Sequence, residues 1–431
     1  MTDRAGKRTD AADRRMDPVK PRAREAEGSV TGTTARFARK TDAVISAATH
    51  IMNNRGLRGM TFVDVADMVG LNTSSVTYYF RRKEHLAAAV FERTLERIET
   101  LVDEAEKEET PRARVAKYVS LNFELHRRIH RGDEQPIAVL SEMRSLEDSV
   151  RRPLGDHYSS IFRRIRDFFG ATDQAWGKAL NTARAQVLTE NMYWLPVWLF
   201  HYSYSDFDRV QHRMLDLFDK GLALPDAPWD PQCVALDRGA GMSRGHASFL
   251  KAATRLVSEF GYRGASVEAI AAELNVTKGS FYHYLEAKEA LVLDCFRNSY
   301  GAMGTVLAAE WDQGQWQRLT SVVATLLDIQ FDGDWPLLRT TAMQTLPPHV
   351  REGVVSRAAR MALTLAGTIT DGICDDAIRP VDPLIAAQAI MSGLNAAYEL
   401  RNWSHRFDDR EQAVRVYAST LLYGLFSEPP Q

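Results

Sequence analysis

The sequence predicts an all-α protein made of two similar halves, and three observations support this prediction. A chain of 431 residues is longer than a single hydrophobic core usually serves, which favours about two to four domains. Val44–Leu86 aligns without a gap on Phe249–Leu291 after a shift of 205 positions, so a unit of domain size is duplicated. Apolar residues in and after both segments recur at the spacing of amphipathic helices.

Composition and charge are those of an ordinary globular protein. Apolar residues make up 45% of the chain, charged residues 26%, and the net charge is −2. The longest apolar stretches, such as Tyr193–Phe200, are shorter than the roughly 20 residues that a membrane helix needs. Three cysteines, Cys233, Cys295 and Cys374, lie far apart and form no metal-binding spacing. We therefore expect a cytoplasmic protein without a membrane segment, a metal site or a cofactor.

The first segment, residues 1–39, is expected to be a disordered basic arm. Lys and Arg outnumber Asp and Glu there, and aliphatic residues are few. Such an arm either adds contacts to DNA phosphates or is a solvated tail.

Each repeat unit is predicted to begin with an amphipathic helix that ends at a glycine. Gly56 and Gly261 end it, because glycine best tolerates the left-handed conformation found at helix C-termini. The apolar face of this helix is Val44, Ala47, Ala48, Ile51 and Met52 in the first copy, and Phe249, Ala252, Ala253, Leu256 and Val257 in the second.

Two short helices follow in each copy. The residues suited to cap them are Thr61 and Asn72 in the first copy and Ser266 and Thr277 in the second. Gly70 and Asn275 separate the two helices, since both residue types tolerate positive φ. Two short helices joined by such a turn and packed on a longer helix form a helix-turn-helix.

The third helix of each copy is predicted to hold one apolar and one polar face. The apolar positions are Val76, Tyr79 and Phe80, and Phe281, Tyr284 and Leu285. The polar positions are Thr73, Ser74, Thr77 and Tyr78, and Lys278, Gly279, Tyr282 and His283. A short polar helix face fits the DNA major groove, and Lys83 or Lys288 beyond the helix can bind phosphates.

The second copy resembles the DNA-binding domain of the tetracycline-repressor (TetR) family over Ala265–Leu291. The matching motif runs from Val276 through Tyr284 to Lys288 and Glu289, with Leu285 where the family usually has Phe. The resemblance implies DNA contacts by Ser266, Thr277, Lys278, Ser280, Tyr282, His283 and Lys288, and a close backbone approach at Gly279.

The first copy also looks TetR-like, and it departs from the family at the reading positions. The matching residues are Thr61, Ala66, Gly70, Ser75, Tyr79, Phe80, Lys83 and Glu84. Thr73 stands for the usual Lys, Ser74 for Gly and Thr77 for Tyr, although Arg81 and Arg82 add positive charge nearby. This head either reads a different half-site or binds weakly.

The resemblance implies that each head is followed by a helical body that dimerises and often encloses a small-molecule pocket. The expected domains are residues 1–39 (arm), 40–86 (first head), 87–224 (first body), 225–244 (linker), 245–291 (second head) and 292–427 (second body). The predicted interface helices are 173–202, bent near Pro196, and 206–222 in the first half, with 383–403 and 410–426 in the second. One chain would then form a monomeric pseudo-dimer, with heads one turn of DNA apart, in preference to a homodimer.

Aromatic residues in the bodies are candidates for a small hydrophobic effector pocket. They are Tyr193, Trp194, Trp198, Trp335 and Met343. Residues of this kind at helical spacing are otherwise core or interface positions.

No enzyme motif accompanies the heads. GxSxG, HExxH and GxxxxGK[ST] are absent from the sequence. His126 and His130 have the spacing of a metal pair, and the arginines around them favour a solvated basic face. The sequence therefore predicts a regulator, more readily a repressor, bound to a double-stranded DNA operator that is asymmetric or pseudo-palindromic. The alternative is a helical interaction or ligand-sensing module in which one or both heads no longer bind DNA.

Overall fold

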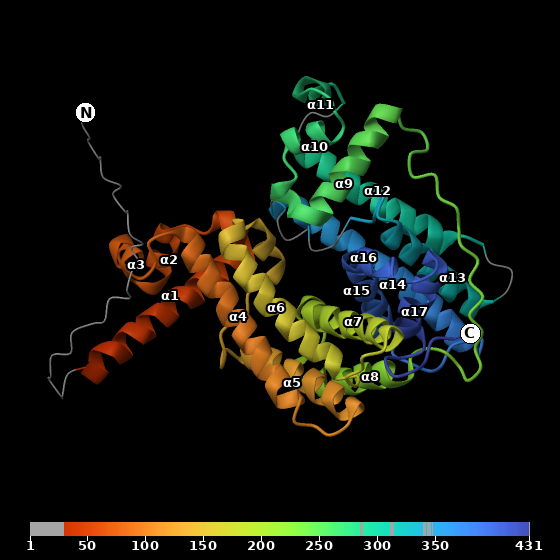
Figure 1. Cartoon of the computed structure of the whole chain (residues 1–431), viewed down its shortest axis with the longest axis horizontal. Helices are drawn as coiled ribbons and strands as arrows, with labels where there is room; N and C mark the ends of the chain where they lie inside the picture. The colour runs from red at the N-terminus through yellow and green to blue at the C-terminus, as the bar shows by residue number, and fades with distance from the viewer. Residues whose placement is uncertain are drawn as a thin grey trace, which may run out of the picture. The chain divides into compact units, whose positions relative to one another are not determined.

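The computed structural model describes residues 30–284, 288–310, 314–338, 342, 346 and 348–430. All regular secondary structure in these residues is helical (Figure 1). Contacts divide the chain into two compact units, residues 1–43 and 44–431. The features described below lie in the second unit, apart from the beginning of α1. The all-α fold class predicted from the sequence is confirmed.

Two series of helices follow the order expected from the duplication. The first half contains α1 (Val30–Gly59), α2 (Phe62–Val69), α3 (Thr73–Tyr79), α4 (Lys83–Ala105), α5 (Pro111–Arg131), η1 (Leu140–Ser145), α6 (Asp148–Asp167), α7 (Ala175–Leu199), η2 (Tyr204–Asp206) and α8 (Phe207–Lys220). The second half contains α9 (Arg244–Gly264), α10 (Val267–Glu273), α11 (Lys278–Tyr284), α12 (Lys288–Ala308), α13 (Gln315–Asp332), α14 (Pro348–Cys374), α15 (Pro383–Ala397), η4 (Tyr398–Leu400), α16 (Arg401–Ser404) and α17 (Arg410–Leu422).

Helix α1 begins earlier than the sequence predicted. Residues 30–39, which were expected to belong to the disordered arm, are helical. Residues 35–40, Ala-Arg-Phe-Ala-Arg-Lys, are mostly strong helix formers, which favours this extension, whereas residues 30–34 include Gly32 and three threonines and do not favour it locally. The remainder of the predicted arm, residues 1–29, lies outside the described residues.

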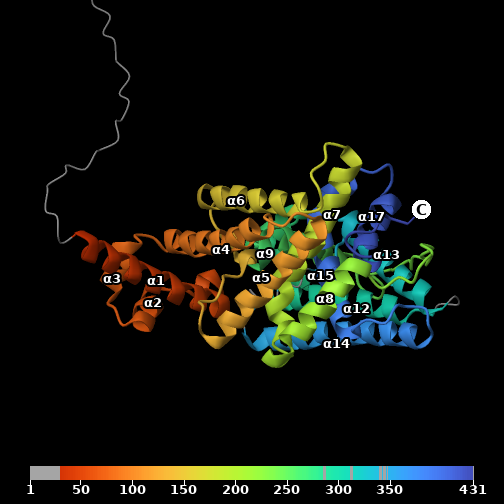
Figure 2. The ribbon, with the colours of Figure 1, turned by 90° about the horizontal axis from the view of Figure 1, so that it is seen from below.

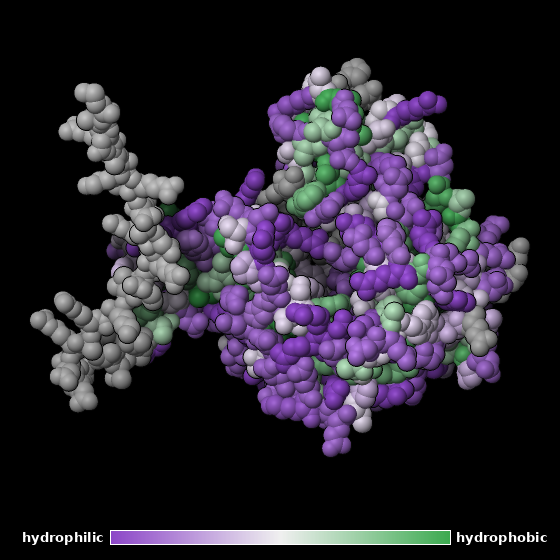
Figure 3. All heavy atoms as spheres, in the orientation of Figure 1, coloured by the Kyte–Doolittle hydropathy of each residue, from purple (hydrophilic) through white to green (hydrophobic). Residues whose placement is uncertain are grey.

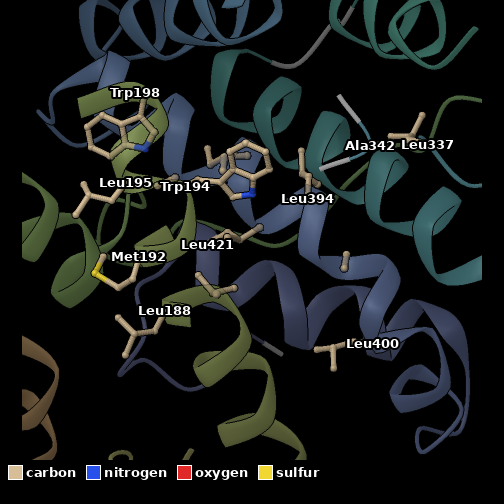
Figure 4. Close-up of a cluster of buried hydrophobic side chains, with 14 of the residues drawn as sticks. Leu188, Met192, Trp194, Leu195, Trp198, Leu337, Ala342, Leu394, Leu400 and Leu421 are labelled. Atoms are coloured by element: carbon tan, nitrogen blue, oxygen red, sulfur yellow. The ribbon is translucent and has the colours of Figure 1, made fainter. Parts of the chain in front are cut away.

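The two halves pack together through the last helices of each. Helix α7 contacts α15 and α17, and α8 contacts α15. Figure 4 draws Trp194 and Trp198 of α7 among buried side chains that include Leu394 of α15 and Leu421 of α17. Pro196 lies inside α7, as expected. The predicted interface helices therefore meet within a single chain.

A pair of glycines marks the place where the halves cross. Gly221 and Gly424, at the ends of the last helices, have φ of 65° and 95°. A Cβ on Gly221 would lie 2.4 Å from the carbonyl oxygen of Leu422, and one on Gly424 would lie 2.7 Å from that of Asp219. Backbone hydrogen bonds join the same segments, since Leu222 N–H donates to Leu422 O at 2.7 Å. Only glycine fits this mutual approach.

Residues 228–234, between α8 and α9, lie along α13. The backbone N–H groups at Gln232 and Val234 donate to Ser321 Oγ (2.8 Å) and Thr325 Oγ1 (3.1 Å) of α13. Trp316 Nε1, also on α13, donates to the carbonyl oxygen of Pro228 at 2.8 Å. Side chains of α13 thus supply hydrogen-bond partners for backbone N–H and C=O groups of this non-helical segment, which would otherwise lose their contact with water without replacement.

His126 corrects the sequence interpretation. It was expected on a solvated basic face, and it is buried in α5 with 8% of its surface exposed. Burial lowers the pKa of His126 to about 4, and the nearby charge of Arg97 adds to the effect. His130, four residues later, is exposed and lies against Tyr204. The four-residue spacing that suggested a metal pair therefore separates a core residue from a surface residue.

Polar side chains cover most of the face shown in Figure 3. No helix among the described residues is long and apolar enough to cross a membrane.

Candidate nucleic-acid interface

The first head is ordered by the caps that the sequence predicted. Thr61 Oγ1 accepts the N–H of Asp64 at 3.1 Å and donates to the carboxylate of Asp64 at 2.5 Å, which fixes the start of α2. Gly70 ends α2 with φ 65°. Asn72 Oδ1 accepts the N–H of Ser75 at 2.8 Å and so caps α3. The turn between α2 and α3 is therefore closed on both sides.

The second head has the same framework built from different residues. Ser266 Oγ accepts the N–H of Ala269 at 3.0 Å at the start of α10. Asn275, at the position of Gly70, adopts φ 53°. Phe281 is fully buried and packs edge-on against Phe249 of α9, with ring centroids 5.8 Å apart. In both copies the first helix is broken at the predicted glycine, with φ 69° at Gly56 and 73° at Gly261.

Helix α3 presents a polar face to solvent. Thr73, Ser74 and Thr77 are exposed, and Tyr78 is 75% exposed. Val76 on the opposite face is fully buried. The hydroxyls are partly engaged within the head, since Ser74 Oγ and Ser75 Oγ both donate to Asn72 Oδ1, at 2.8 and 2.6 Å. Tyr78 is the most exposed of the large apolar and aromatic side chains of this head.

Helix α11 presents the corresponding face of the second head. Thr277, Lys278 and Gly279 are exposed, and Tyr282 is 52% exposed. A Cβ on Gly279 would have only Thr277 Oγ1 within 4 Å, so its backbone is open to close approach. The side chains of Ser280, His283 and Tyr284, and all of Leu285, lie outside the described part of the chain.

One feature of the second head was not predicted. Lys278 Nζ lies 2.5 Å from Glu268 Oε1 of α10, and both side chains are more than half exposed. The hydrogen bond that Lys278 donates to Glu268, together with the negative charge of Glu268, raises the pKa of Lys278 above its ordinary value. The positions that correspond to this pair in the first head are Val63 and Thr73, which carry no charge. The spacing of ten residues hides the pair from a search for helical neighbours.

The two lysines expected to bind phosphates join the heads to the bodies. Lys83 Nζ donates to the carbonyl oxygen of Arg58 at 2.9 Å, and Lys288 Nζ lies 4.4 Å from the ring centroid of Tyr262. Each lysine is at the start of the helix that follows its head, α4 or α12. Both are half-buried and contact the end of the first head helix.

The predicted effector residues occupy several environments. Trp194 and Trp198 are buried, and Trp194 Nε1 donates to Glu190 at 2.9 Å. Tyr193 and Trp335 are partly buried, and Met343 lies outside the described residues. A pocket is present elsewhere, between α12 and α14, and is lined by none of these five residues. No group of His, Cys, Asp and Glu residues suited to a metal ion is found in the described parts of the chain.

Two helix-turn-helix heads with solvent-facing third helices place the protein in the class of DNA-binding transcriptional regulators. The family model described as bacterial regulatory proteins of the tetR family matches residues 44–90 and again 249–295. The chain therefore carries two TetR-like DNA-binding units in tandem.

Relatives of this chain each span less than half of it. The TetC protein of transposon Tn10 from Escherichia coli is 22% identical over 180 residues, which cover 41% of this chain and 89% of TetC. A tetR-family regulatory protein from Rhodococcus RHA1 is 21% identical, with a TM-score of 0.36, over 42% of this chain and 98% of its own. The regulator FadR from Bacillus subtilis, solved with stearoyl-CoA, is 14% identical, with a TM-score of 0.32, over 41% and 96% of the two chains.

Proposed function

We propose that this protein is a cytoplasmic transcriptional repressor, and not an enzyme, that binds one operator with both heads of a single chain. The observation that carries the proposal is that two exposed third helices, α3 and α11, belong to one polypeptide whose halves are joined by α7, α8, α15 and α17. A monomeric pseudo-dimer thus supplies the two heads that regulators of this kind otherwise obtain by dimerisation.

The two third helices are proposed to read different half-sites. Thr73, Ser74, Thr77 and Tyr78 form one reading face, and Lys278, Gly279, Tyr282 and His283 form the other. Because side chains of different length and charge select different base edges, the operator is asymmetric or only pseudo-palindromic. Thr61, Asn72, Ser75, Ser266, Thr277 and Ser280 would add contacts around each helix start, where helix N-termini favour phosphate.

The role of Lys83 and Lys288 follows from their positions. Each ammonium group contacts the end of a head helix while remaining partly exposed. We infer that they position the heads on the bodies and also bind phosphates.

Selection of binding sites from a random duplex library, followed by footprinting of the full chain, tests the proposal. The expected result is one protected site with two unlike half-sites, bound by one chain as judged from the mass of the complex. A perfect palindrome bound by two chains would contradict it. Loss of half of the footprint in a Thr77→Ala/Tyr78→Ala variant would assign that half to the first head, whereas an unchanged footprint would show that the first head is idle.

A second candidate function, a protein-interaction or ligand-sensing module, is favoured by the departures of the first head from the TetR motif. Salt separates the two candidates. Binding to DNA releases counterions, so the affinity should fall steeply with salt concentration. Association with another protein need not show this dependence. Release of the operator by a small hydrophobic effector, with Tyr193, Trp194, Trp198, Trp335 and Met343 as the first candidates for its pocket, is part of the same proposal.

A further inference from the structure

The duplicated bodies differ in the groove between two corresponding helices. In the first half this groove lies between α4 and α6 and is bridged by charged pairs. His157 of α6 has Nδ1 3.2 Å from Glu92 and Nε2 3.0 Å from Glu99, both on α4. Arg164 of α6 reaches Glu99, Asp103 and Glu106 of α4 at 3.1, 2.5 and 2.6 Å. The hydrogen bonds of His157 and the ion pairs of Arg164 therefore close the first groove.

The second half leaves the corresponding groove open. Helix α14 runs alongside α12 (Figure 2). Between them is a pocket of about 290 Å³ with an apolar floor of Phe296, Tyr300 and Val354. Phe296, Tyr300 and Val354 are buried. This volume lies just below the range for small-molecule sites, roughly 300–1,000 Å³.

Three guanidinium groups surround this apolar floor. They belong to Arg297 on α12 and to Arg357 and Arg360 on α14. Arg297 pairs with Asp294 of its own helix at 2.5 Å, and Arg360 donates to Ser356 Oγ at 3.2 Å. Neither Arg357 nor Arg360 has an ion-pair partner among the residues that the structure describes. Where α4 carries Glu92, the same shift of 205 positions places Arg297 on α12. At this position of the groove the charge is therefore reversed.

We propose that the pocket between α12 and α14 binds an organic carboxylate with an apolar body, and that the first half has no such site. Arg357 and Arg360 would bind the carboxylate, since guanidinium groups match its two oxygens. The apolar part would contact Phe296, Tyr300 and Val354. Helix α12 begins at Lys288, which stacks on Tyr262 of the second head, so a ligand on α12 is connected to that head. The inference deepens, and rests on, the effector part of the proposed function.

Calorimetric titration of the full chain with octanoate and with octanol, in the absence of DNA, tests the charge requirement. Octanoate is expected to bind and octanol to bind at least roughly tenfold more weakly, because only the carboxylate forms charge-assisted hydrogen bonds. An Arg357→Gln/Arg360→Gln variant should lose octanoate affinity by a similar factor. Arg152→Gln, at an exposed arginine of α6 in the first half, is the matched control and should bind as the parent does. Equal affinity for octanol, or unchanged octanoate binding by the double variant, would overturn the proposal.

A second pair of variants tests the apolar floor. Gly353 lines the pocket, and a Cβ added there meets no atom within 4 Å. Gly353→Leu should fill the pocket and abolish octanoate binding, while Gly353→Ala should change it little. Circular dichroism would verify that both variants keep the helical content of the parent. Octanoate binding that survives Gly353→Leu would place the ligand elsewhere.

The outcomes also separate this inference from the proposed function. Specific operator binding without octanoate binding would contradict only the proposed carboxylate site. Octanoate binding without operator binding would contradict the proposed repressor function and support the carboxylate site.

Discussion

The groove between α4 and α6 is closed by His157 and Arg164, whereas the groove between α12 and α14 is open and lined by arginines. A parallel difference separates the heads, where neutral Val63 and Thr73 correspond to the charged pair Glu268 and Lys278. The apolar framework did not diverge in this way. The fully buried Val76 and Phe281 occupy the same position of α3 and α11.

These differences show which residues of a duplicated unit can be substituted with little loss of stability. A buried residue contacts many neighbours at close packing, so a change there costs stability directly. An exposed charge has few such constraints and contributes little to stability. The two halves therefore share one fold and differ in the charged residues on their surfaces.

The largest expected effect comes from breaking the contact between the halves. Gly221→Ala should lower the free energy of unfolding by roughly 3 kcal/mol or more, because its Cβ would lie 2.4 Å from the Leu422 carbonyl oxygen and its φ is 65°. Gly132→Ala is the matched control. Its φ is 79° and a Cβ there meets nothing within 4 Å, so only the backbone strain of about 1 kcal/mol is expected. Urea denaturation of both variants measures the difference, and equal losses would mean that the crossing is not tightly packed in solution.

The contact between Gly221 and Gly424 could not be predicted from the sequence. Local rules located Gly56, Gly70 and Gly261 correctly, since each ends or breaks a helix whose periodicity is visible in the chain. The approach of Gly221 to Gly424 depends on residues about two hundred positions apart. No local pattern marks such a contact.

The features of the candidate sites also fall into those that local sequence predicts and those that form only on folding. Helix caps at Thr61, Asn72 and Ser266 are local and were predicted. The pocket on α12 and α14 was missed, because its arginines and its apolar floor come together only after folding. The burial of His126 was missed for the same reason, since neighbouring arginines suggested a surface helix.

His126 gives the second prediction, because the same shift places buried Phe331 of α13 at its position. The folded state depresses the pKa of His126 from 6.5 to about 4, so below pH 6.5 the unfolded chain takes up a proton that the folded chain does not. This group should therefore cost stability progressively as the pH falls from about 6.5 to 4, by about 3 kcal/mol in total.

The measurement is the slope of unfolding free energy against pH. His126→Phe should flatten that slope between pH 6.5 and 4, and because a slope is measured, a constant packing cost of the substitution cancels. An identical slope in His126→Phe and the parent would mean that folding does not lower the pKa of His126.

The third prediction exchanges the reading residues of the two heads and assumes that they bind DNA as proposed. Thr77 is the counterpart of Tyr282, and both are exposed. Tyr282→Thr should weaken operator binding by roughly tenfold, the size of one lost hydrogen bond to a charged group. Thr77→Tyr should strengthen it by roughly threefold, since a neutral hydrogen bond is worth less. Fluorescence anisotropy with the selected operator measures both, and a gain in affinity from Tyr282→Thr would contradict the proposed contact of Tyr282 with DNA.

The smallest expected effect concerns the pair that distinguishes the charged head. Glu268→Gln removes a carboxylate 2.5 Å from Lys278 and leaves the cation without its partner, so DNA affinity should rise by roughly two- to threefold, as expected for one exposed ion pair. The plot of log affinity against log salt concentration should steepen by up to about one unit, because one more cation is then available to displace counterions. Val63→Glu in the first head is the reciprocal variant. It introduces a carboxylate without a lysine at position 73, so it should weaken binding without creating an ion pair. If Glu268→Gln changes neither affinity nor salt dependence, Lys278 does not approach the duplex, and the charge difference between the heads has no part in DNA binding.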